Sequence, residues 1–138
     1  KRIVPHVIEP AVGINRLFLM VLADAYVQEE KRIVLKLNPN LAPFKVAVFP
    51  LVANKPELTQ KARQIYSELN KSFSVAWDDR GNIGKRYLAQ DEIGTPWCVT
   101  IDYATLEDGA VTVRDRDTTK QERIPVQNLT AYFQQKLV

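Results

Sequence analysis

The sequence is poor in the residues that usually carry covalent or metal chemistry. Its 138 residues include one cysteine, Cys98, and one histidine, His6. A single thiol can form no internal disulfide and leaves no second thiol for a metal site, so the composition suits a reducing cytosol. Cys98 also alternates with large apolar residues as in a strand, and His6 has no Ser, Cys or acidic partner at a telling spacing. We therefore expect neither residue to be catalytic, and we expect no metal site.

Long apolar runs are also missing. No run reaches the roughly 20 residues that a membrane-spanning helix requires, and the hydrophobic fraction of 46% and charged fraction of 25% are ordinary for globular proteins. The first residues show no charged segment, apolar stretch and cleavage site of the kind found in a secretory signal, and we expect the sequence to begin in mid-fold. We expect a soluble, cytoplasmic protein with no membrane partner, about the size of one domain.

The charge balance is mildly basic, and the chain has no internal repeat or low-complexity segment. The formal net charge is +3 and the sequence pI is about 9.0. Such a bias permits a polyanionic partner such as a nucleic acid, but it does not demonstrate one.

The apolar pattern predicts an α/β fold. Residues 3–8 indicate a strand, and a turn rich in Gly and Pro leads from it into an apolar helix over about 16–25. Residues 28–43 are polar and rich in helix breakers, which is typical of a linker. The remaining segments predict a mixed sheet flanked by helices, with strands over 45–51, 73–77, 97–103, 110–114 and 122–126, and helices over 56–69, 83–92 and 128–137.

The turn before the first helix carries the first candidate site. Gly13 would allow a tight backbone approach, and Arg16 falls in the first helical turn. A helix N-terminus favours anions, so a cation there is unfavourable unless a group such as a nucleotide phosphate lies between them. Arg16 could clamp that phosphate, and Glu9 could hold a ligand ammonium. An ordinary surface Arg and an exposed Glu near a turn would explain the same spacing.

The helix predicted over 83–92 carries its charges in the order that the helix dipole disfavours. With Asn82 as its N-cap, two cations lie near the positive end and two carboxylates near the negative end: Lys85 and Arg86, then Asp91 and Glu92. Cations beside Tyr87 could meet RNA phosphates and a stacked base. Surface ion pairs would also account for the pattern.

Two further groups of residues suggest structure, not binding. Trp77 and Trp97 fit the core faces of their strands. Four cations alternate with carboxylates around the last predicted hairpin, which is typical of a solvated sheet edge that resists edge-to-edge pairing; they are Arg114, Arg116, Lys120 and Arg123.

Four stretches resemble class II aminoacyl-tRNA synthetases of the glycyl type. Residues 4–16 resemble the third signature motif of that family, and 41–51 resembles the entry to its anticodon-binding domain. Residues 81–96 are similar to a segment shared by the glycyl, histidyl, prolyl and threonyl enzymes, and 112–117 resembles a glycyl-specific stretch. The likeness covers nearly the whole chain, and several long motifs occur in the expected order.

The resemblance implies a two-step ligase. Glycine and ATP with Mg²⁺ give glycyl-adenylate, and the glycyl group then passes to the terminal ribose of glycine tRNA. Residues 1–28 would form the C-terminal end of the catalytic domain, 29–43 a linker, and 44–138 the anticodon-binding domain. The family also implies a homodimer for the full-length protein, whereas this chain alone is expected to be inactive.

The matching positions imply three sets of site residues. Arg16 is the catalytic candidate, on the ATP phosphates, and the Glu9 carboxylate would face the substrate ammonium. The glycine pocket would be lined by Glu9, Pro10, Ala11, Val12 and Gly13, and ATP would be contacted by Gly13, Ile14, Asn15 and Arg16. The tRNA candidates are Arg80, Lys85, Arg86, Asp91, Glu92 and Thr95. Many glycyl enzymes have serine in place of Ala11, which weakens any case for a hydroxyl contact there.

Two other interpretations stay open. A non-catalytic relative, such as the synthetase-like accessory subunit of mitochondrial DNA polymerase, would use the same architecture only for nucleic-acid and protein binding. A flavodoxin-like small-molecule module is disfavoured, because no glycine-rich phosphate loop follows the strand that ends near Leu51.

Overall fold

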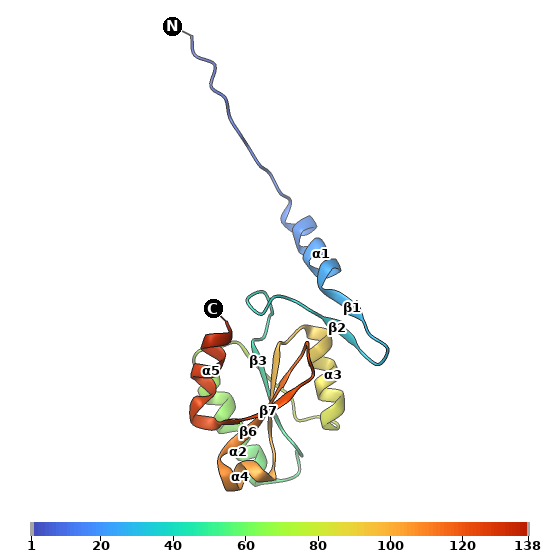
Figure 1. The fold of residues 1–138 in the computed structure, drawn as a ribbon, viewed down its shortest axis with the longest axis vertical. Coiled ribbons are helices and arrows are strands. Elements are labelled where there is room, and N and C mark those ends of the chain that lie inside the picture. The colour runs from blue at the N-terminus through green and yellow to red at the C-terminus, as the bar shows by residue number, and fades with distance from the viewer. Residues whose placement is uncertain (1, 138) are drawn as a thin grey trace.

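A five-stranded sheet organises the C-terminal two thirds of the chain (Figure 1). The computed structural model describes residues 2–137. Lys1, the first residue of the domain predicted over 1–28, and Val138, the last residue of the domain predicted over 44–138, lie outside the described residues. Strand order is β4-β3-β5-β6-β7, with β3 parallel to both neighbours and β6 and β7 antiparallel. The strands are β3 (Val46–Pro50), β4 (Val75–Trp77), β5 (Trp97–Ile101), β6 (Ala110–Asp115) and β7 (Gln121–Pro125). The predicted mixed sheet is confirmed.

Helices cover both faces of this sheet (Figure 1). α2 (Pro56–Leu69) and α5 (Leu129–Lys136) pack on one face, and α3 (Ile83–Ile93) packs on the other. Successive side chains of a strand point to opposite faces, so Val48 of β3 contacts the first layer and Phe49 the second. Every residue of β3 is buried, as expected of a parallel strand with helices on both sides.

Three features of the sheet unit and of the segment before it were not predicted. An antiparallel hairpin pairs β1 (Tyr26–Gln28), at the end of the segment assigned to the catalytic domain, with β2 (Ile33–Leu35) in the predicted linker. A short helix, α4 (Tyr103–Asp108), lies between β5 and β6, where only a turn was predicted. Asp102 caps α4 with a capping box, which explains how so short a helix begins. A 3₁₀ turn, η1 (Val126–Asn128), precedes α5.

The hairpin is fixed against the C-terminal end of α3. Gly94 ends α3 with φ +86°, and a Cβ on it would lie 3.0 Å from both the Leu35 carbonyl oxygen and Leu37 Cδ1. Glycine is therefore required both for the left-handed conformation and for the close approach of the hairpin. Arg116 donates hydrogen bonds to the carbonyls of Gly94 at 2.8 Å and Leu37 at 2.9 Å. The region predicted as a linker is thus docked on the sheet unit.

The N-terminal arm differs from the sheet unit (Figure 1). The strand predicted over 3–8 is not formed, because residues 2–13 have no neighbouring strand in the described part of the chain to complete their hydrogen bonds. α1 (Ile14–Ala25) forms as predicted, but of its residues only Ala25 is buried. No helix within residues 2–137 is long and apolar enough to cross a bilayer.

Candidate nucleic-acid interface

α3 presents an exposed stripe and a buried stripe. In a helix, residues three or four positions apart lie on the same face. The exposed stripe comprises Lys85, Leu88 and Glu92, and the buried stripe comprises Arg86, Gln90 and Asp91. Lys85 and Arg86, and likewise Asp91 and Glu92, are adjacent in the sequence but have opposite surroundings.

Arg86 is 2% exposed and is bonded to backbone carbonyls. Its guanidinium donates to Pro50 at 2.6 Å, Gly81 at 2.8 Å, Arg80 at 3.0 Å and Asp79 at 3.1 Å. Pro50 ends β3, and the other three carbonyls belong to the loop between β4 and α3. Arg86 thus ties two strand ends to the start of α3. The prediction that this side chain meets an RNA phosphate does not fit its enclosed position.

Asp91 is fully buried between two arginines. Arg114 donates to both of its carboxylate oxygens, at 2.8 and 3.0 Å, and Arg32 Nη1 donates to Oδ2 at 2.8 Å. Burial by itself would lower the pKa of Arg114, but the hydrogen bonds and charge of Asp91 raise that pKa. The interpretation of Arg114 and Arg116 as a solvated edge is wrong, since they are 7% and 2% exposed. Arg32 and Arg114 compensate the Asp91 carboxylate near the negative end of α3.

The six tRNA candidates thus divide into two groups. Thr95 is fully buried and donates to Gln90 Oε1 at 2.6 Å, so it joins Arg86 and Asp91 inside the protein. Arg80, Lys85 and Glu92 are exposed. Lys85 has no ion-pair partner within residues 2–137. Its amide donates to the Asn82 side chain at 2.9 Å, which confirms the predicted N-cap.

A groove of about 250 Å³ opens beside the N-terminal half of α3. Leu51, which follows β3, and Asp102, which follows β5, lie at its base. β3 connects through α2 to β4 on one side, whereas β5 connects through α4 to β6 on the other. In open α/β sheets, ligands bind outside the carboxyl ends of strands where the connections diverge in this way. The remaining lining residues are Ile83, Tyr87, Thr100, Thr112 and Gln121.

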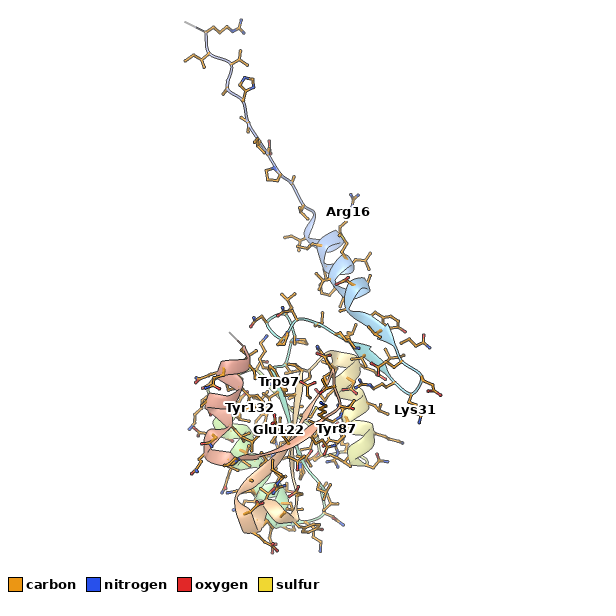
Figure 2. All side chains as sticks on the ribbon, viewed as in Figure 1. Arg16, Lys31, Tyr87, Trp97, Glu122 and Tyr132 are labelled. Carbon is orange, nitrogen blue, oxygen red and sulfur yellow. The ribbon has the colours of Figure 1, made fainter. Side chains whose placement is uncertain are left out.

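The walls of the groove are held by hydrogen bonds and by packing. The Tyr87 hydroxyl and Thr100 Oγ1 are 2.6 Å apart, and Arg114 Cζ lies 4.9 Å from the centroid of the Tyr87 ring. Figure 2 shows Tyr87 between α3 and the sheet. Burial raises the pKa of the Tyr87 hydroxyl. Burial alone would also raise the pKa of Asp102, but hydrogen bonds from Arg123 and others lower it and keep the carboxylate ionised.

Cys98 lies within the sheet and plays no part in this surface. It is 1% exposed, and burial raises the pKa of its thiol to about 12. A protonated, enclosed thiol is inert. No three His, Cys, Asp or Glu side chains of residues 2–137 are grouped so that they could hold a metal ion.

The glycine and ATP candidates lie on the arm, away from α3. Residues 9–16 are all exposed, and Figure 2 shows Arg16 at the far end of α1 from the sheet. A Cβ on Gly13 would meet nothing within 4 Å, so no described residue requires glycine there. The described residues form no pocket around Glu9 or Arg16. The structure therefore gathers the tRNA candidates at one helix but leaves the other two sets on an open arm.

Several residues of this interface carry no signal in the sequence. Arg32 lies in a polar stretch that predicts a linker, and Gln121 lies beside an ordinary turn. The importance of Leu51 and Asp102 depends on the strand order, which shows where the connections diverge. Only the charge order of the 83–92 helix pointed to this region in advance.

The fold and the site together define an α/β binding domain with its groove at the carboxyl ends of parallel strands. A family model described as the anticodon binding domain matches residues 45–136, and the chain belongs to that family.

Curated relatives extend the match to the whole chain. It is 53% identical over 143 aligned residues to the glycine–tRNA ligase of Borreliella burgdorferi and 49% identical over 147 to that of Streptomyces coelicolor. Each alignment covers 100% of this chain and 32% of the relative. The chain therefore spans about a third of the length of the curated relatives it matches.

Proposed function

We propose that this chain recognises the anticodon of glycine tRNA as part of a glycine–tRNA ligase. The observation that carries the proposal is 53% identity across the whole chain to a protein of that name. The family of residues 45–136 supports the RNA-binding half of the proposal. The complete ligase would use glycine and ATP with Mg²⁺ in the cytoplasm, and the resemblance to class II enzymes implies that it is a homodimer.

Within this function, we propose that residues 1–28 belong to the catalytic domain, 29–43 connect it, and 44–138 bind the anticodon. The apolar surface of α1 supports the first boundary, because Phe18 and Leu19 are 64% and 67% exposed. Such a surface is typical of one that packs against further protein. The docked hairpin means that the connection would be a fixed joint, not a loose tether.

The exposed tRNA candidates would make the direct contacts. Arg80 and Lys85 can bind phosphates, and Glu92 can accept hydrogen bonds from the amino groups of unpaired bases. Arg86, Asp91 and Thr95 would act indirectly, by fixing α3 and the strand ends beside it. This division follows from burial, because an enclosed side chain with all its bonds made inside the protein has none to offer RNA.

The arm would complete the catalytic site from one side only. Arg16 would contact the ATP phosphates and Glu9 the glycine ammonium, with residues 9–13 lining the glycine pocket and 13–16 the ATP site. The described residues neither enclose these groups nor offer an acidic cluster for Mg²⁺. We therefore expect no ATP–pyrophosphate exchange from the 138-residue chain alone.

Salt-dependent RNA binding tests the proposal. If Arg80 and Lys85 make about two phosphate contacts to a single-stranded loop, raising salt from 50 to 200 mM should weaken binding about sevenfold. Fluorescence anisotropy with a labelled anticodon stem-loop of glycine tRNA measures this. A stem-loop with a scrambled anticodon loop is the control. Equal affinity for both RNAs would contradict the proposal that this chain recognises the anticodon. Robust ATP–pyrophosphate exchange by this chain would contradict the proposal that its arm forms only one side of the catalytic site.

A further inference from the structure

We propose that the groove beside Tyr87, on the α3 face of the sheet, holds one unpaired nucleobase, with Gln121 of β7 as its specificity-determining residue. The inference rests on the proposed anticodon function and adds the position and chemistry of a base-reading pocket. None of the six tRNA candidates lines this groove. It begins where the connections of β3 and β5 diverge, at Leu51 and Asp102, and it extends across β6 to Gln121 at the start of β7.

The size and lining of the groove fit a flat ring. Its volume of about 250 Å³ lies just below the roughly 300–1,000 Å³ range of pockets that enclose drug-sized ligands. Leu51, Ile83 and Tyr87 provide an apolar and aromatic wall. A base displaced from its stack needs such a surface for its ring and hydrogen-bonding groups for its edge, and this is how sequence-specific RNA recognition usually works.

The polar groups of the groove are not equally free. Asp102 already accepts hydrogen bonds from the Thr105 amide and hydroxyl, from Thr112 and from Arg123. Those donors occupy the roughly four lone-pair sites of a carboxylate. Thr100 is engaged by the Tyr87 hydroxyl. These groups shape the groove, but they leave little capacity for a ligand.

Gln121 is the free polar group. Its side-chain amide has no hydrogen-bond partner within residues 2–137, and the residue is exposed. In the sheet register Gln121 pairs with Arg114, which pairs with Cys98, so all three lie on the face that α3 covers. An amide carries both a donor and an acceptor, which match adjacent acceptor and donor groups on a base edge.

The buried charges of α3 hold this groove in shape. Arg86 is bonded to the carbonyl of Pro50, next to Leu51. Asp91 fixes Arg114, whose guanidinium lies over the ring of Tyr87. Preformed walls reduce the ordering that binding would otherwise require.

Substitution Gln121→Met tests the inference, because it keeps the length of the side chain and removes the amide. Binding to the glycine anticodon stem-loop should weaken roughly threefold to tenfold, the effect of losing one or two neutral hydrogen bonds. Gln134→Met is the matched control, since Gln134 is exposed on α5 across the sheet. Equal melting temperatures of both variants and the wild type would show that the fold is retained.

Stem-loops with one anticodon nucleotide made abasic identify the contact. With one of the three abasic loops, wild type and Gln121→Met should bind equally, because the partner of the amide is gone. The inference is overturned if Gln121→Met binds the intact loop like the wild type, or if its loss is the same factor with all three abasic loops. If the wild type still binds the intact loop more tightly than the scrambled loop, and does so in a salt-dependent way, the proposed anticodon function is retained. Loss of that preference in the wild type overturns both.

Discussion

Adjacent residues of α3 differ more in their surroundings than residues at its opposite ends. Lys85 and Arg86 carry the same charge, yet one is exposed and the other is 2% exposed. Asp91 and Glu92 repeat the contrast near the other end, with Asp91 fully buried. The buried member of each pair organises the protein and the exposed member is left for a ligand. Helical phase, and not charge, decides which role a residue takes.

The largest expected effect on stability comes from the acidic pair. Asp91→Asn removes the charge that compensates Arg32 and Arg114, and breaking a buried ion pair in this way costs about 3–5 kcal/mol. Glu92→Gln next to it should change stability by at most about 0.5 kcal/mol. Urea unfolding followed by circular dichroism measures both. Similar midpoints for the two variants would remove the contrast.

A smaller loss of stability is expected from the basic pair. Arg86→Met leaves the Pro50 carbonyl and the loop carbonyls without their donor, which should cost about 2–4 kcal/mol. Lys85→Met is the matched control and should stay within about 0.5 kcal/mol of the wild type. The same unfolding experiment applies, and an unchanged midpoint for Arg86→Met would show that its bonds contribute nothing net.

The smallest expected effect concerns RNA binding, in which the exposed Lys85 should matter although it contributes little to stability. Affinity falls as salt rises, and Lys85→Met should make this dependence shallower: the slope of log affinity against log salt should shrink in magnitude by about 0.7, the contribution of one phosphate contact to a single strand. Glu92→Gln, which removes no cation, should leave that slope unchanged. Anisotropy titrations at several salt concentrations measure it, and an unaltered slope in Lys85→Met would exclude this lysine from the interface.

Local pattern was sufficient for much of the sheet unit. The helix over 56–69 was predicted from the spacing of Leu58, Ala62, Ile65, Tyr66 and Leu69; Tyr66 is half-buried and the other four are buried. Asn82 caps α3 and Gly94 ends it, as their chemistry suggests. These features depend on a few neighbouring residues, which is why the sequence shows them.

Long-range contacts account for what was missed. Arg32 and Asp91 are separated by 59 positions, and their bond docks a segment that locally resembles a linker. Arg114 pairs with Asp91, which is 23 positions away in the sequence. Its immediate neighbours alternate in charge, and this local pattern led to the prediction of a solvated sheet edge. The strand over 3–8 was wrong for the opposite reason, since a suitable local sequence lacks neighbouring strands in the described residues.

The sequence by itself determined the five strands of the main sheet and the helices α2, α3 and α5, the apolar faces that pack together, and the likeness to a family. Only the tertiary structure decided which charges are enclosed and where the groove opens. Periodicity and capping are properties of residues a few positions apart. The burial of Arg86, and the groove that Leu51 and Gln121 both line, depend on how distant strands are ordered in the sheet.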